Sequence, residues 1–86
     1  MNDLKKIRSD IDKLDHQMLT LIKKRLDLVI KIGKIKKENN LKIRDLKREK
    51  EVLEKIIRKA NTLSLSPIFV KKIWQIFFKE SYKSEI

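Results

Sequence analysis

The chain has 86 residues, with 23 Lys and Arg against 12 Asp and Glu, a formal net charge of +11, one His and no Cys. This length allows one domain, expected over residues 1–86, while the composition excludes disulfides and leaves too few ligands for a structural zinc site. A monomer of this size buries only about 60% of its unfolded surface, so association with another chain is the expected source of further stability.

The first predicted element is a long amphipathic helix over about residues 4–38. A helix of this length would be about 50 Å long, nearly twice the diameter of a compact domain of this size, so its own chain cannot cover it. Gly33 is its only weak point. Apolar residues recur along it in alternating steps of three and four, as on one helix face, at Leu4, Ile7, Ile11, Leu14, Met18, Leu21, Leu28, Ile32 and Ile35.

Two shorter helices are predicted after a loop at residues 39–42. A second apolar stripe indicates a helix over about residues 45–60. Ser66 and Pro67 indicate the start of the third helix, because Ser is a favoured N-cap and Pro a favoured first helical residue. No strand pattern is present. The expected fold class is therefore all-α, with one long and two shorter helices intertwined with a second copy in a helical-bundle dimer.

Two cations on the first helix occupy positions where its periodicity calls for an apolar residue. Arg25 falls between Leu21 and Leu28, and Lys36 lies almost three full turns further on, on the same face. A buried guanidinium is strongly unfavourable unless a carboxylate or an anionic ligand compensates it. A buried ion pair or a snorkelling Arg would explain Arg25 equally well, and Lys36 also suits a helix C-terminus.

The other two helices show the same feature. Glu49 occupies an apolar position on the second helix, with Arg48 beside it and Asp45 one turn earlier, although Asp45 and Glu49 also suit a helix N-terminus. Ser81 and Glu85 continue the apolar stripe of the third helix. Because all three helices carry such residues, we predict a polar pocket inside a bundle.

Arg8 completes this set only if a second chain is present. It precedes Arg25 by about 25 Å along one helix, too far for both to hold one small molecule. If two long helices pack antiparallel, Arg8 of one chain approaches the middle of the other and creates two equivalent pockets. A solvated Arg near a helix start is the alternative explanation.

In their order and spacing, these residues resemble the all-helical chorismate mutase family, an intertwined dimer of three-helix chains. The matching segments span essentially the whole sequence and lie at residues 7–15, 24–29, 32–36, 44–49 and 80–85. The last segment resembles mutase domains fused to prephenate dehydrogenase more than those fused to prephenate dehydratase.

The resemblance implies a rearrangement of chorismate to prephenate with no covalent intermediate, metal or other cofactor. It implies that Arg25, Arg48 and Arg8 of the partner chain hold the two substrate carboxylates, assisted by Ser81. Planar guanidinium groups suit carboxylates better than ammonium groups do. Clamping both carboxylates would hold the reacting arm over the ring and lower the entropic part of the barrier.

The resemblance also implies which groups contact the rest of the substrate. Glu49 and the backbone of Asp45 would hold the ring hydroxyl. Lys36 and Glu85 would face the ether oxygen, where negative charge grows as the C–O bond breaks. Lys36, Glu85 and Arg25 are therefore the expected catalytic residues. An ionised Glu only accepts hydrogen bonds, so Glu85 is expected to act in its protonated form.

Three alternatives use the same sequence features. A net charge of +11 also suits nucleic-acid binding, which is disfavoured because the Lys residues are scattered over every helix without a recognisable binding motif. A structural dimerisation module would use Arg25 and Glu49 as a buried pair that sets the register. An isochorismate pyruvate lyase of the same fold would use a similar cationic pocket.

The expected location of the protein is the cytoplasm. No apolar run approaches the roughly 20 residues that span a bilayer, and the first six residues lack the apolar core of a signal peptide. We therefore expect no membrane partner. The expected partners are chorismate, prephenate and a second copy of the chain.

Overall fold

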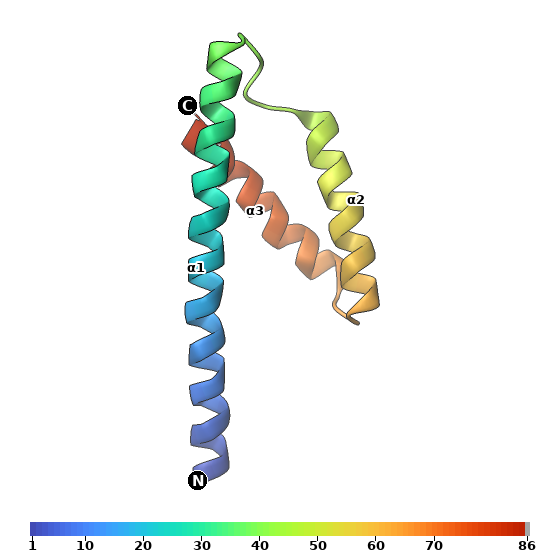
Figure 1. Ribbon diagram of the computed structural model, residues 1–86. Coiled ribbons are helices and arrows are strands. Elements are labelled where there is room, and N and C mark those ends of the chain that lie inside the picture. Colours follow the sequence, from blue (N-terminus) through green and yellow to red (C-terminus); the bar gives the residue numbers. More distant parts are fainter. Residues whose placement is uncertain (86) are drawn as a thin grey trace.

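The computed structural model describes residues 1–85 and contains three α-helices (Figure 1). They are α1 (Asn2–Glu38), α2 (Leu46–Thr62) and α3 (Pro67–Glu85). The described residues contain no strand, so the prediction of an all-α fold with one long and two shorter helices is confirmed. None of these helices is both long and apolar enough to cross a membrane.

The two shorter helices begin with side-chain caps. Asp45 precedes α2, and its Oδ1 accepts a hydrogen bond from the backbone N–H of Arg48 at 3.0 Å. Ser66 precedes α3, and its Oγ accepts from the backbone N–H of Phe69 at 3.3 Å, with Pro67 as the first helical residue. Each cap satisfies one of the free N–H groups of a helix start. The predicted start of the third helix is confirmed.

Helix α3 holds the chain together, because it packs against both α1 and α2 while α1 and α2 do not pack on each other (Figure 1). The result is an open, elongated protomer of 58 × 24 × 15 Å. Its radius of gyration is 16.4 Å, whereas a compact domain of this length has about 12 Å.

Few apolar side chains are buried in this open shape. The buried apolar residues are Ala60, Val70 and Phe78, which lie on α2 and α3. Every residue from 1 to 21 is exposed, and the apolar stripe of α1 faces solvent along this segment, with Leu14 at 56% exposure and Leu21 at 62%. Exposed apolar area of this extent is typical of a protein–protein interface.

Helices α1 and α3 approach each other most closely at Gly33. Gly33 is the one buried residue of α1, and a side chain there would meet the backbone of Glu85 in the last turn of α3. The helix runs through Gly33 without a break. The sequence marked this residue only as a weak point of the helix, whereas in the fold it is the point of contact with α3.

Candidate active site

A cavity of about 270 Å³ receives side chains from all three helices. Apolar and aromatic groups form part of its wall, at Val29, Ile32, Val52, Phe78 and Tyr82. Its polar wall consists of seven of the eight predicted site residues, namely Arg25, Lys36, Asp45, Arg48, Glu49, Ser81 and Glu85. The fold therefore brings together residues that lie up to 60 positions apart in the sequence.

Arg25 lies in this cavity without a carboxylate partner. Its Nη1 donates a hydrogen bond to Ser81 Oγ at 3.1 Å, and its guanidinium carbon lies 5.1 Å from the centre of the Phe77 ring. No carboxylate of residues 1–85 lies within ion-pairing distance of it. Partial burial and, to a lesser extent, the charge of Arg48 lower the pKa of Arg25. Within the described chain, a buried ion pair therefore does not account for Arg25.

Lys36 and Glu85 form an ion pair in the same cavity. Lys36 Nζ lies 2.9 Å from Glu85 Oε1, and their side chains are 16% and 5% exposed. Lys36 Nζ also donates to the backbone carbonyl of Ile43, which fixes the ammonium group from a second side. A charge-assisted hydrogen bond in a partly dry site is strong and directional. The cavity therefore holds one ammonium group in a defined position.

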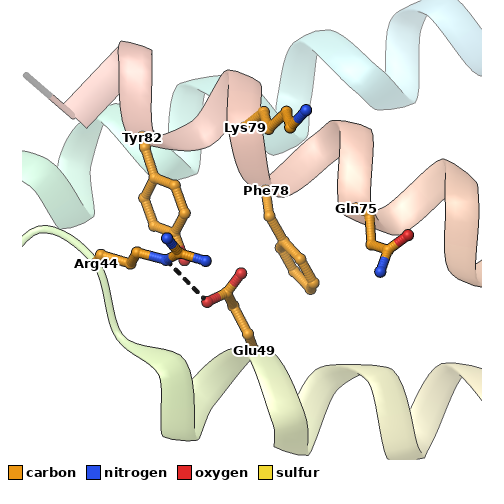
Figure 2. Close-up of a pocket in the computed structure, with 6 residues that line it drawn as sticks. All are labelled: Arg44, Glu49, Gln75, Phe78, Lys79 and Tyr82. Atoms are coloured by element: carbon orange, nitrogen blue, oxygen red, sulfur yellow. Dashed lines mark ion pairs between the residues drawn. The ribbon is translucent and has the colours of Figure 1, made fainter.

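Glu49 lines both this cavity and a neighbouring pocket of about 430 Å³, whose lining residues are drawn in Figure 2. Its Oε2 lies 3.5 Å from Arg44 Nε and has no hydrogen-bond partner among the described residues. The Arg44 guanidinium carbon lies 5.7 Å from the centre of the Tyr82 ring. Burial, followed by the neighbouring Glu49 carboxylate, raises the pKa of Tyr82 to about 12. Arg44 thus contacts both the Glu49 carboxylate and the Tyr82 ring.

Arg44 and Tyr82 had no predicted role. Tyr82 follows the buried Phe78 by four residues and shares its side of α3, which is the sequence signal for its place in the wall. Arg44 precedes α2 in an irregular segment, where no periodicity indicates the direction of its side chain. Its contact with Glu49 arises only from the fold.

Asp45 and Arg48 also line the cavity, and each side chain has a partner in α2. The Asp45 carboxylate caps α2, so its side chain has the structural role named as the alternative explanation. The Arg48 side chain is largely exposed and pairs with Glu51 at 3.7 Å. Arg48 therefore reaches the cavity with only a weak surface partner to displace.

Arg8 does not line the cavity. It lies on the exposed N-terminal part of α1, which extends away from α2 and α3 (Figure 1). One chain therefore provides seven of the eight residues. A contribution from Arg8 requires a second chain and stays a prediction.

Comparisons with known proteins show what the chain is similar to. The profile of the family described as chorismate mutase type II matches residues 7–86. The chain is 36% identical over 80 residues to a bifunctional chorismate mutase/prephenate dehydratase of Buchnera aphidicola subsp. Schizaphis graminum, which covers 93% of this chain and 21% of that protein. It is 35% identical over 85 residues to the T-protein of Haemophilus influenzae, covering 99% and 22%.

A solved structure shares both fold and sequence. It is a conserved hypothetical protein from Pyrococcus furiosus, with a TM-score of 0.76 and 37% identity, covering 100% of this chain and 99% of that one. The chain spans about a fifth of the length of the curated relatives named above. One of those relatives is named as a prephenate dehydratase fusion and the name T-protein states no fused activity, so the expected closer similarity to dehydrogenase-fused domains stays a prediction.

Proposed function

The chain belongs to the chorismate mutase type II family, and on this premise we propose that it is an isomerase that rearranges chorismate to prephenate in aromatic amino acid biosynthesis. The observation that carries the proposal is Arg25, a partly buried guanidinium with no carboxylate partner among residues 1–85, in a cavity that also holds Arg48 and Lys36. Chorismate carries two carboxylates, and such a site compensates them.

Binding by these cations would fix the reacting conformation. Arg25 and Arg48 would each hold a carboxylate through charge-assisted hydrogen bonds, with Ser81 as a further donor. The enolpyruvyl arm would then lie over the ring, so the new C–C bond forms as the ether C–O bond breaks, within one molecule. No proton or external group is exchanged, and the contribution of the protein is positioning together with electrostatics.

Lys36 would provide the electrostatic part. Negative charge grows on the ether oxygen as its bond to the ring breaks, and an ammonium group fixed in advance stabilises that charge without reorganisation. Lys36 is fixed in this way by Ile43 and Glu85. Glu49, held by Arg44, would accept a hydrogen bond from the ring hydroxyl, next to the backbone of Asp45.

In the free site the Glu85 carboxylate pairs with Lys36. With substrate bound, Glu85 is expected to contribute a second hydrogen bond to the ether oxygen in its protonated form, because an ionised carboxylate only accepts. Glu85→Gln keeps a donor at this position and should retain turnover, whereas Glu85→Ala should lower kcat by about a hundredfold or more. A Glu85→Ala variant with the kcat of the wild type would contradict the role of Glu85.

The site is proposed to be completed by a second copy of the chain. The exposed apolar stripe of α1 and the length of this helix support a two-fold dimer in which Arg8 reaches the cavity of the partner. This arrangement predicts complementation. Arg8→Ala and Arg25→Ala homodimers should both be nearly inactive, whereas a refolded mixture should regain activity, because half of its dimers are mixed and each mixed dimer contains one intact site.

The control for complementation is the same mixture kept without unfolding, which should stay inactive. If chains pair at random, the refolded mixture is expected to approach a quarter of wild-type activity. No recovery after refolding, with a normal size by analytical ultracentrifugation, would contradict the placement of Arg8 across the interface.

The decisive experiment follows the loss of chorismate in the ultraviolet with purified protein. Product analysis on chorismate and on isochorismate separates the mutase from a pyruvate lyase of the same fold. Prephenate as the product supports the proposal. Pyruvate formed from isochorismate would show that the chain is the lyase. No turnover of either compound would contradict both activities.

A further inference from the structure

Gly33 lies beside the groups proposed to act on the ether oxygen. It is buried and precedes Lys36 by three residues, on the same side of α1. An ideal Cβ at position 33 would lie 2.8 Å from Glu85 Cα, 3.0 Å from its carbonyl oxygen and 3.1 Å from its Cβ. Real Cβ atoms essentially never approach another atom to less than 3.0 Å, and rotation of a side chain cannot move backbone atoms out of the way.

We propose that Gly33 is a positioning residue, which acts by leaving room for the Glu85 backbone and so sets where the Glu85 carboxylate lies in the cavity. The inference rests on the proposed function, because it concerns the same reacting oxygen. With Glu85 seated against Gly33, its side chain is 5% exposed and reaches Lys36 Nζ at 2.9 Å. A side chain at position 33 would push the last turn of α3 away from α1.

Such a displacement would separate Glu85 from Lys36 instead of moving both. Lys36 belongs to α1, and its ammonium group is also held by the carbonyl of Ile43 in the segment before α2. Glu85 belongs to α3, at the end of the described chain. The predicted effect is therefore confined to one of the two groups at the ether oxygen. Arg25 belongs to α1 and Arg48 to α2, so neither would move with the last turn of α3.

Gly33→Ala distinguishes displacement of Glu85 from destabilisation of α1 as the cause of lost turnover. In a helix interior Ala is favoured over Gly by about 1 kcal/mol, so the substitution strengthens α1 intrinsically. Any loss of turnover then has to come from the contact with α3. The far-ultraviolet circular dichroism of the variant should match that of the wild type.

The experiment is a double-mutant cycle in kcat and KM, with the wild type, Gly33→Ala, Glu85→Ala and the double variant. Loss of one donor to a developing oxyanion lowers kcat about a hundredfold to a thousandfold. Because Gly33→Ala would displace the Glu85 carboxyl group without removing it, we expect kcat to fall by up to about a hundredfold and KM to change by less than about threefold. The double variant should match Glu85→Ala, because the group that Gly33 positions is then absent. Lys31→Ala, an exposed change on the same helix, is the control and should retain wild-type kcat.

A second measurement does not depend on activity. The ¹H–¹⁵N signal of the Lys36 ammonium group should be observable in the wild type, because the group is paired and mostly buried, and should be lost in Gly33→Ala. A nuclear Overhauser contact between the Hα protons of Gly33 and Glu85 tests the approach in the wild type, even if the variant does not fold.

These outcomes separate the inference from the proposed function. Equal losses of kcat from Gly33→Ala in the wild-type and Glu85→Ala backgrounds, an unchanged Lys36 signal, or no contact between the Hα protons would overturn the positioning role. If the wild type leaves chorismate unchanged while Gly33→Ala removes the Lys36 signal, the proposed function fails and the contact at Gly33 stands.

Discussion

Arg25→Ala is expected to lower kcat/KM by about a hundredfold or more, the largest effect of any single substitution on substrate binding. The guanidinium has no carboxylate partner among residues 1–85, so the substrate would provide its counter-charge. Truncating one partner of a buried charge pair costs about 2–5 kcal/mol, and each 1.4 kcal/mol corresponds to a tenfold change. Initial rates of chorismate loss at several substrate concentrations measure the effect.

The fold should tolerate this change. Arg25 contributes one hydrogen bond to Ser81 and a ring contact to Phe77, and its charge is unfavourable beside Arg48. The thermal unfolding midpoint should therefore stay close to that of the wild type. Arg25→Lys keeps the charge without the planar fork and should give an intermediate rate.

Arg58→Ala is the matched control, because it removes the same type of side chain from an exposed position of α2. It should leave kcat/KM within about twofold of the wild type, as surface substitutions usually do. If Arg25→Ala has the same kcat/KM as Arg58→Ala, the proposed role of Arg25 in the mechanism is wrong.

Lys36→Ala is expected to lower kcat about a hundredfold to a thousandfold, with a smaller change in KM. The reason is that the ammonium group would meet the ether oxygen most strongly in the transition state, after negative charge has developed. The substitution also leaves the Glu85 carboxylate buried without its cation. Breaking one side of a buried pair costs about 3–5 kcal/mol of folding stability, so the unfolding midpoint should fall as well.

A double variant separates these two effects. Lys36→Ala combined with Glu85→Gln removes the isolated buried charge and should recover most of the lost stability, but not the turnover. Recovery of turnover together with stability would show that Lys36 acts only through the fold. Circular dichroism melting and steady-state rates on the same samples distinguish the outcomes.

The sequence predicts those parts of the fold in which helical periodicity decides which face of a helix a side chain occupies. The three helices follow from apolar spacing, and the start of α3 follows from the cap residue Ser66. Arg25 and Lys36 lie on one face because eleven residues make almost three turns. Their shared placement in the cavity is therefore a direct result of α1 being continuous.

Tertiary contacts account for what the sequence did not reveal. The approach of Glu85 to Gly33 depends on how α3 crosses α1, and the pairing of Arg44 with Glu49 depends on the path of the segment before α2. Neither contact leaves a periodic pattern.

The exposed N-terminal segment of α1 has a consequence for biogenesis. Residues 1–21 are synthesised before α2 and α3, yet the described chain provides no surface for them to pack on. Isolated helices are only marginally stable in water, so if the proposed dimer forms, a newly made chain would carry this arm unprotected until it meets another copy. Encounter between chains, and not the speed of helix formation, would then limit how fast newly translated protein becomes resistant to proteases.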